Sequence, residues 1–146
     1  MSSFLIKILL TLSLIACSIC IFAQDNKAVK KVKQILHSQA DAWNQGDIDT
    51  FMEDYWKSEK LQFIGSKGVT YGWDLTKTNY KKRYPNKEAM GHLSFDIINV
   101  DQQSRKVISL VGKFTLKRGI GDLSGHFLLI FKKIKGKWVI IADHTS

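Results

Sequence analysis

The spacing of apolar residues predicts two helices at the start of the folded part of the chain. From Asn26 to Gln45 the apolar positions recur every three or four residues, the period of one helix face: Val29, Val32, Leu36, Ala40 and Trp43. Gly46 closes this helix, and Asp47 is a residue type that caps the next one. A second short stripe contains Ile48, Phe51, Met52 and Tyr55. We therefore expect two helices that meet at a tight corner.

Much of the remaining chain has the composition and alternation that are typical of strands. A short hairpin is predicted from Leu61 to Tyr71. Residues 72–84 have helical spacing and are followed by Pro85. Four long strands are then expected near residues 90–100, 107–116, 125–131 and 138–145, joined as a meander by polar and glycine-containing turns. Helices ahead of a run of antiparallel strands predict an α+β domain, with the N-terminal helices packed on one face of a curved antiparallel sheet.

The first 23 residues have the composition of an export signal. Lys7 precedes an apolar run over residues 8–15, and Ala23 offers a cleavage site ahead of the polar residues 24–26. We divide the chain into a signal peptide, residues 1–23, and one domain, residues 24–146. The mature domain is expected in the periplasm or outside the cell, without stable membrane insertion. Two alternatives stay open: a retained N-terminal anchor, and a lipoprotein attached through Cys17, because residues 14–17 resemble a lipoprotein box.

The cysteine positions and the net charge narrow the function classes. Both cysteines, Cys17 and Cys20, lie in the first segment, so cleavage after Ala23 leaves no disulfide and no thiol nucleophile. The formal charge of +9 is carried by lysine clusters scattered over the predicted helices and hairpins, an arrangement typical of solvated faces. A nucleic-acid reader would concentrate its basic residues in one stripe with exposed aromatic residues. We therefore expect no nucleic-acid partner.

Several phrases of the sequence resemble the nuclear transport factor 2-like superfamily, which includes ketosteroid isomerase and the SnoaL-like proteins. They are AWNQGDID at residues 42–49, GWD at 72–74, GKWVI at 136–140 and DHTS at 143–146. The resemblance covers essentially the whole mature chain. It implies a cystatin-like, cone-shaped fold in which the sheet wraps around the helices and leaves a deep pocket. It also implies a homodimer that packs sheet against sheet.

The same resemblance implies which side chains of the last strand face the pocket, and it bears on whether the protein could isomerise steroids. It implies that Val139, Ile141, Asp143 and Thr145 face the pocket and that His144 faces outward. Ketosteroid isomerase works with a tyrosine and two aspartic acids, and the matching positions here hold other residues: Gln39, Ile64, and Leu128 or Leu129. Steroid isomerisation by that mechanism is therefore not expected, and the chemistry of the pocket must use other groups.

Asp143 and His126 are the candidate catalytic residues. A carboxylate in an apolar cavity has a raised pKa, which suits a general acid or base, and His126 begins an apolar strand near it. The structural alternatives are, for Asp143, a buried carboxylate satisfied by a tyrosine hydroxyl or a backbone donor and, for His126, a solvent-exposed residue at the end of a strand. No close spacing of His, Asp and Glu predicts a metal site, and we expect no cofactor. The candidate ligand-binding residues are Trp43, Tyr55, Trp73, Tyr80, Tyr84 and Ile141.

Two functions of different classes fit these observations. The first is an exported protein that binds a small apolar or aromatic molecule in the cone, with or without acid/base chemistry on it. The second is a non-catalytic dimerisation or interaction module whose pocket is filled by its own side chains, namely Trp73, Tyr80 and Tyr84. The free volume of the cone separates the two, because ligand sites typically enclose a few hundred Å³.

Overall fold

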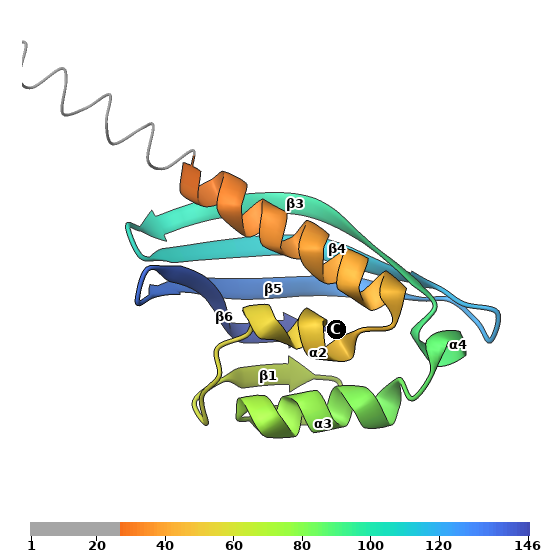
Figure 1. Ribbon diagram of the computed structural model, residues 1–146. Coiled ribbons are helices and arrows are strands. Elements are labelled where there is room, and N and C mark those ends of the chain that lie inside the picture. The colour runs from red at the N-terminus through yellow and green to blue at the C-terminus, as the bar shows by residue number, and fades with distance from the viewer. Residues whose placement is uncertain (1–26) are drawn as a thin grey trace, which may run out of the picture.

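The computed structural model describes residues 27–146, which form one α+β domain (Figure 1). The predicted signal peptide and Cys17 lie outside the described residues. The first helix covers residues 27–45. The other helices are α2 (Ile48–Phe51), the 3-10 turn η1 (Met52–Asp54), α3 (Trp73–Arg83) and α4 (Lys87–Met90). The strands are β1 (Gln62–Gly65), β2 (Gly68–Tyr71), β3 (His92–Ser104), β4 (Val107–Lys117), β5 (Leu123–Ile134) and β6 (Lys137–Thr145).

The sheet has six strands in the order β2-β1-β6-β5-β4-β3. The meander from β3 to β6 is antiparallel, as the sequence predicts. The expectation of a wholly antiparallel sheet is wrong, because β1 pairs in parallel with β6 and brings the short first hairpin into the same sheet. The α4 turn is a second difference, since the sequence analysis predicted only strands after Asn86. Asn86 caps it by accepting a hydrogen bond from the Ala89 N–H at 2.9 Å.

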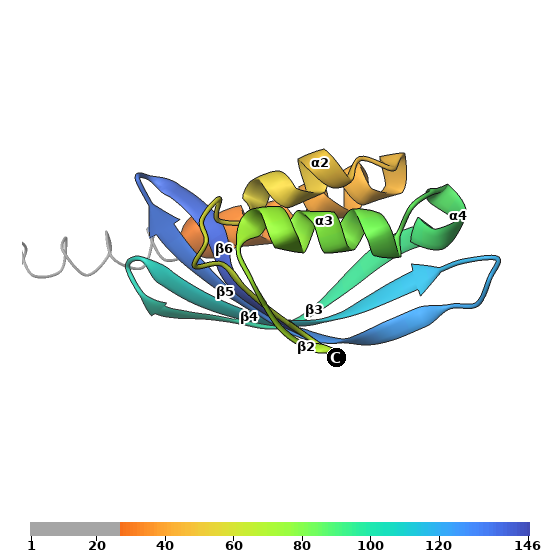
Figure 2. The same cartoon turned by 90° about the horizontal axis from the view of Figure 1, so that it is seen from below.

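The helices cover one face of the sheet, which curves around them (Figure 2). Several apolar residues on the inner face of the long strands are completely buried, among them Ile108, Phe131 and Ile140. Val32 and Leu36 of the first helix belong to the same core. Burial of such side chains is the main favourable contribution to folding. Within residues 27–146, no helix is both long enough and apolar enough to cross a membrane.

The Trp-Asn-x-Gly-Asp corner fixes the helices to the sheet. Trp43 Nε1 donates a hydrogen bond to the Met90 carbonyl at 3.1 Å. The Asn44 side chain accepts from the Leu93 N–H at 2.7 Å and donates to the Leu93 carbonyl at 3.0 Å. Gly46 turns the chain with a φ of 85°, a conformation that favours glycine. Asp47 then caps α2, as predicted, by accepting from the Thr50 N–H at 2.9 Å. This corner positions one wall of the cavity described below.

A β-bulge changes which side chains of β6 face the helices. Ile130 of β5 pairs with Ala142 and Phe131 pairs with Ile140, so Ile141 is the extra residue. Before the bulge, Trp138 and Ile140 are buried, and Val139 is only partly buried. After it, Asp143 is buried and His144 is exposed. The inward assignment of Asp143 and the outward assignment of His144 agree with the structure. The inward assignment of Val139 and Ile141 is wrong, because strict alternation along β6 does not allow for the bulge.

Candidate functional site

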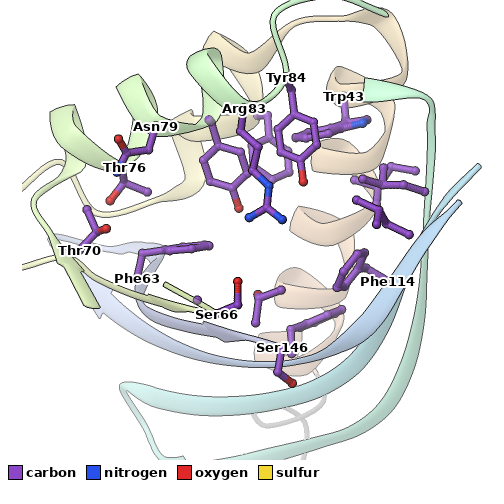
Figure 3. A pocket seen from close by; sticks show the side chains of 18 of the residues that line it. Trp43, Phe63, Ser66, Thr70, Thr76, Asn79, Arg83, Tyr84, Phe114 and Ser146 are labelled. Atoms are coloured by element: carbon purple, nitrogen blue, oxygen red, sulfur yellow. The ribbon is translucent and has the colours of Figure 1, made fainter. Parts of the chain in front are cut away.

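A cavity of about 720 Å³ lies between the helices and the concave face of the sheet (Figure 3). The first helix, α3 and the inner faces of the long strands contribute to its wall. Aromatic side chains form much of the lining: Trp43, Phe51, Tyr55, Phe63, Tyr80, Tyr84, Phe95, Phe114 and Phe127. Such a wall offers apolar surface and ring faces to a ligand.

Four of the six predicted ligand-binding residues line this cavity: Trp43, Tyr55, Tyr80 and Tyr84. Trp73 does not line it, because its indole Nε1 donates to the Met52 carbonyl at 2.9 Å and its ring contacts Lys57 and Lys77. Ile141 does not line it either, because the bulge displaces it from the inner row of β6. Thr145 occupies the inner position near the end of that strand.

Tyr80 lies at the centre of an aromatic cluster that supports the wall. Its ring lies 5.4 Å from Phe51, 5.6 Å from Phe63 and 6.1 Å from Trp43, centroid to centroid, with edge-to-face geometry in each case. Tyr84 stacks on it at 6.2 Å. Edge-to-face and stacked pairs each add stability beyond the area that they bury. The cluster therefore holds the aromatic wall in one arrangement.

Asp143 lies behind the cavity wall and is 3% exposed. Tyr55 donates its hydroxyl proton to Asp143 Oδ2 at 2.7 Å, and Thr145 Oγ1 donates to Oδ1 at 2.6 Å. The Tyr80 hydroxyl interacts electrostatically with Tyr55 and Asp143, which extends the network toward α3. A carboxylate satisfied by a tyrosine hydroxyl is the structural alternative that the sequence analysis left open. Asp143 itself does not line the cavity, but Tyr55 and Thr145, whose hydroxyls it binds, do.

The network shifts the ionisation of its members. Burial raises the pKa of the Asp143 carboxyl, and the hydrogen bonds from Thr145 and Tyr55 counteract only part of that rise. Burial and the negative charge of Asp143 hold the pKa of Tyr55 and of Tyr80 well above the ordinary tyrosine value. The two hydroxyls therefore stay protonated near neutral pH and can donate hydrogen bonds.

His126 lies away from this network. Its side chain is exposed, and strand alternation from the buried Phe127 places it on the opposite face of β5. Its backbone N–H and carbonyl pair with Ser146 at 3.0 Å each, which closes the end of the sheet. The structure therefore does not form the acid/base pair of His126 and Asp143 that the sequence analysis predicted.

The positions set against the catalytic groups of ketosteroid isomerase are near the cavity. Gln39 and Leu129 line it, while Phe63 lines it in place of its neighbour Ile64. Gln39 is buried, and its Nε2 donates to the Phe51 carbonyl at 3.0 Å. These residues supply no carboxylate at the cavity wall. In the part of the chain that the structure describes, no three His, Cys, Asp or Glu side chains gather closely enough to hold a metal ion.

Cationic residues at the cavity are the part of the site that sequence reasoning missed. Lys67 comes from the β1–β2 turn, and Lys82 and Arg83 come from the last turn of α3. From the sequence, the basic run at residues 81–83 was expected on a solvated face. The available signal was helical spacing: Arg83 and Tyr84 follow Tyr80 by three and four residues, so each lies on the same side of the helix as Tyr80.

Comparison with solved structures supports the fold, whereas two other comparisons found no match. No family model matches the chain, and no curated protein matches it. Among solved structures, it is similar to an NTF-2-like protein of unknown function from Shewanella oneidensis, with 39% identity, a TM-score of 0.79, and coverage of 82% of this chain and 98% of that one.

Two further structures share the fold at low sequence identity. A cystatin-like domain from Nostoc punctiforme has 16% identity and a TM-score of 0.69, and the match covers 82% of this chain and 76% of that one. A ketosteroid isomerase-like protein from Erwinia carotovora atroseptica has 16% identity and a TM-score of 0.64, covering 83% and 96%. At such identity the likeness shows the fold alone. The Shewanella protein is matched at 39% identity over nearly its whole length, and the chain therefore belongs to the nuclear transport factor 2-like family.

Proposed function

We propose that this protein binds a small molecule with an apolar or aromatic body in the cavity between the helices and the sheet. The observation that carries the proposal is the free volume of about 720 Å³, which is enclosed by a largely aromatic lining. Ligand sites typically enclose about 300–1,000 Å³ and combine apolar walls with a few polar groups. The hydroxyls of Tyr55 and Thr145 are polar groups of this kind.

The same volume favours binding over a module with a self-filled pocket. That alternative requires Trp73, Tyr80 and Tyr84 to plug the cone. Tyr80 and Tyr84 pack on each other and on the wall, whereas Trp73 lies outside the cavity. Acid/base chemistry is a narrower version of the proposal. It would have to pass through Tyr55 or Thr145, because Asp143 does not line the cavity.

The binding proposal is tested by fluorescence titration with N-phenyl-1-naphthylamine, an uncharged aromatic probe that becomes emissive in apolar sites. The protein should bind it saturably. Leu123 lines the cavity, so Leu123→Trp should fill part of the space and weaken binding. The control is Ser94→Trp, which adds the same indole at an exposed position one residue along β3 from the buried Leu93. Absence of saturable binding, or equal loss in both variants, would contradict the proposal.

We also propose that the chain is exported and acts in the periplasm or outside the cell. The support is the signal-like segment of residues 1–23. The expected result is a mature N-terminus at or next to Gln24, measured by intact mass of protein recovered from the periplasm. A retained segment of residues 1–23 would contradict cleavage. A lipid adduct on Cys17 would replace it with the lipoprotein alternative.

Finally, we propose that two copies pack through the outer face of the sheet. Leu128 of β5 is 38% exposed on that face, which it shares with three partly buried apolar residues: Ile130 of the same strand, Val111 of β4 and Val139 of β6. A second copy would cover these side chains through a two-fold interface. Light scattering after size exclusion should give twice the mass of one mature chain, and Leu128→Glu should give a folded monomer. A monomeric parent protein at micromolar concentration would contradict this proposal.

A further inference from the structure

The basic residues of α3 divide into two groups with different surroundings. Lys77 and Lys81 both form ion pairs with Asp49, with Lys81 Nζ at 2.8 Å from Oδ2, and they lower the pKa of that carboxyl. Lys82 and Arg83 instead line the cavity. The two lysines that face α2 therefore share one carboxylate, while no ion pair is formed by Lys82 or Arg83 among the described residues.

Arg83 is directed into the cavity. Figure 3 shows its guanidinium between α3 and the sheet, in the same space that Tyr84 and Phe63 border. The guanidinium carbon lies 5.7 Å from the centre of the Tyr84 ring, a cation–π distance that helps to hold the side chain there. Within residues 27–146, Arg83 has no carboxylate partner and no side-chain hydrogen bond.

The charged side chains among the described residues that line the cavity are all cationic. Lys67, on the β1–β2 turn, adds a third cation to those of Lys82 and Arg83. No Asp or Glu is among the described residues that line the cavity, and Asp143 is enclosed behind Tyr55 and Thr145. A cluster of cations beside low-dielectric walls focuses a positive potential. Such a field favours ligands that carry negative charge.

We propose that the ligand of this cavity is an amphipathic anion: an aromatic or apolar body with a carboxylate, sulfonate or phosphate group, which Arg83 binds. This inference rests on the proposed binding function and names the class of ligand for the same site. A guanidinium presents several N–H donors in a planar fork that fits such groups with two parallel hydrogen bonds. Lys67 and Lys82 add positive charge to the same cavity lining, and the aromatic wall contacts the apolar body.

The test uses two probes that share one aromatic skeleton. 1-Anilinonaphthalene-8-sulfonate carries an anionic group, and N-phenyl-1-naphthylamine is its uncharged counterpart. The protein should bind the anionic probe more tightly, and added salt should weaken the anionic probe only. Arg83→Gln keeps most of the side-chain length but removes the charge. It should weaken the anionic probe by at least about tenfold, because hydrogen bonds to charged groups are the strong ones, and leave the neutral probe unchanged.

Lys81→Gln is the matched control, because it removes the same charge from the same helix outside the cavity lining. It should leave both affinities unchanged. If neither probe binds the parent protein, the binding function itself fails. If the neutral probe binds as tightly as the anion, or if Lys81→Gln costs as much as Arg83→Gln, the anion preference fails while binding stands. Arg83 is exposed, so the variant should fold, and thermal unfolding checks this. The effect of salt on binding of the anionic probe to the parent protein is an independent test that needs no variant.

Discussion

Replacing Trp43 with alanine should lower the free energy of unfolding by about 3–5 kcal/mol, the usual cost of removing a large buried aromatic side chain. Trp43 is 3% exposed and makes edge-to-face contacts with Phe51 at 5.2 Å and Tyr84 at 4.8 Å. Its indole also supplies the hydrogen bond to the Met90 carbonyl, which the variant would lose. The change thus removes packing from the core and the link between the first helix and α4.

Chemical denaturation of the Trp43→Ala variant measures this loss, and Trp73→Ala is its control. Trp73 is another tryptophan that donates to a backbone carbonyl, but it is only partly buried and lies outside the cavity lining. Its replacement should cost less, since less apolar surface returns to water. A smaller loss for Trp43 than for Trp73 would contradict the role given to the corner.

Replacing Asp143 with asparagine should change both the stability and its dependence on pH. Tyr55 and Thr145 donate to different oxygens of Asp143, and in asparagine one of these becomes an amide nitrogen, which cannot accept a hydrogen bond; the lost bond should cost roughly 1–3 kcal/mol. Burial raises the pKa of Asp143 in the folded state, so the folded chain holds this proton more tightly than the unfolded chain. Its contribution is complete below the unfolded pKa and is lost as pH rises through the raised folded pKa.

The difference in unfolding free energy between the parent protein and Asp143→Asn should therefore be largest near about pH 4 and decrease as pH rises. The other shifted carboxyls, including Asp47, Asp49 and Asp122, are present in both proteins and cancel in the difference. Denaturation curves at a series of pH values give this difference directly. A difference that grows with pH would mean that the pKa of Asp143 is lowered, and it would contradict the buried network.

The helical corner could be predicted from sequence because its signals are local. Asp47 as a cap and the buried stripe of Ile48, Phe51, Met52 and Tyr55 depend only on residues within two turns. The order of the long strands followed from their length and from the polar turns between them. The parallel pairing of β1 with β6 could not be predicted in this way, because it joins residues 80 positions apart through a strand of four residues.

The site was less predictable, because one extra residue in a strand changes which of its side chains face the cavity. One bulged residue in β6 leaves Asp143 and Thr145 inward but removes Ile141 from the cavity. The pairing of Tyr55 with Asp143 spans 88 residues, and no local pattern indicates it. Arg83 was missed because a basic residue in the last turn of a helix is usually solvated and stabilises the helix dipole. Only the position of α3 over the sheet turns that side chain toward the cavity.

Ligand binding in the cavity can be seen in a crystal structure of the protein with N-phenyl-1-naphthylamine bound. We expect probe density inside the cavity, in contact with the aromatic cluster around Tyr80, which includes Trp43 and Tyr84. Density only on the outer face of the sheet, or a cavity that the protein's own side chains close in the presence of the probe, would contradict the binding proposal.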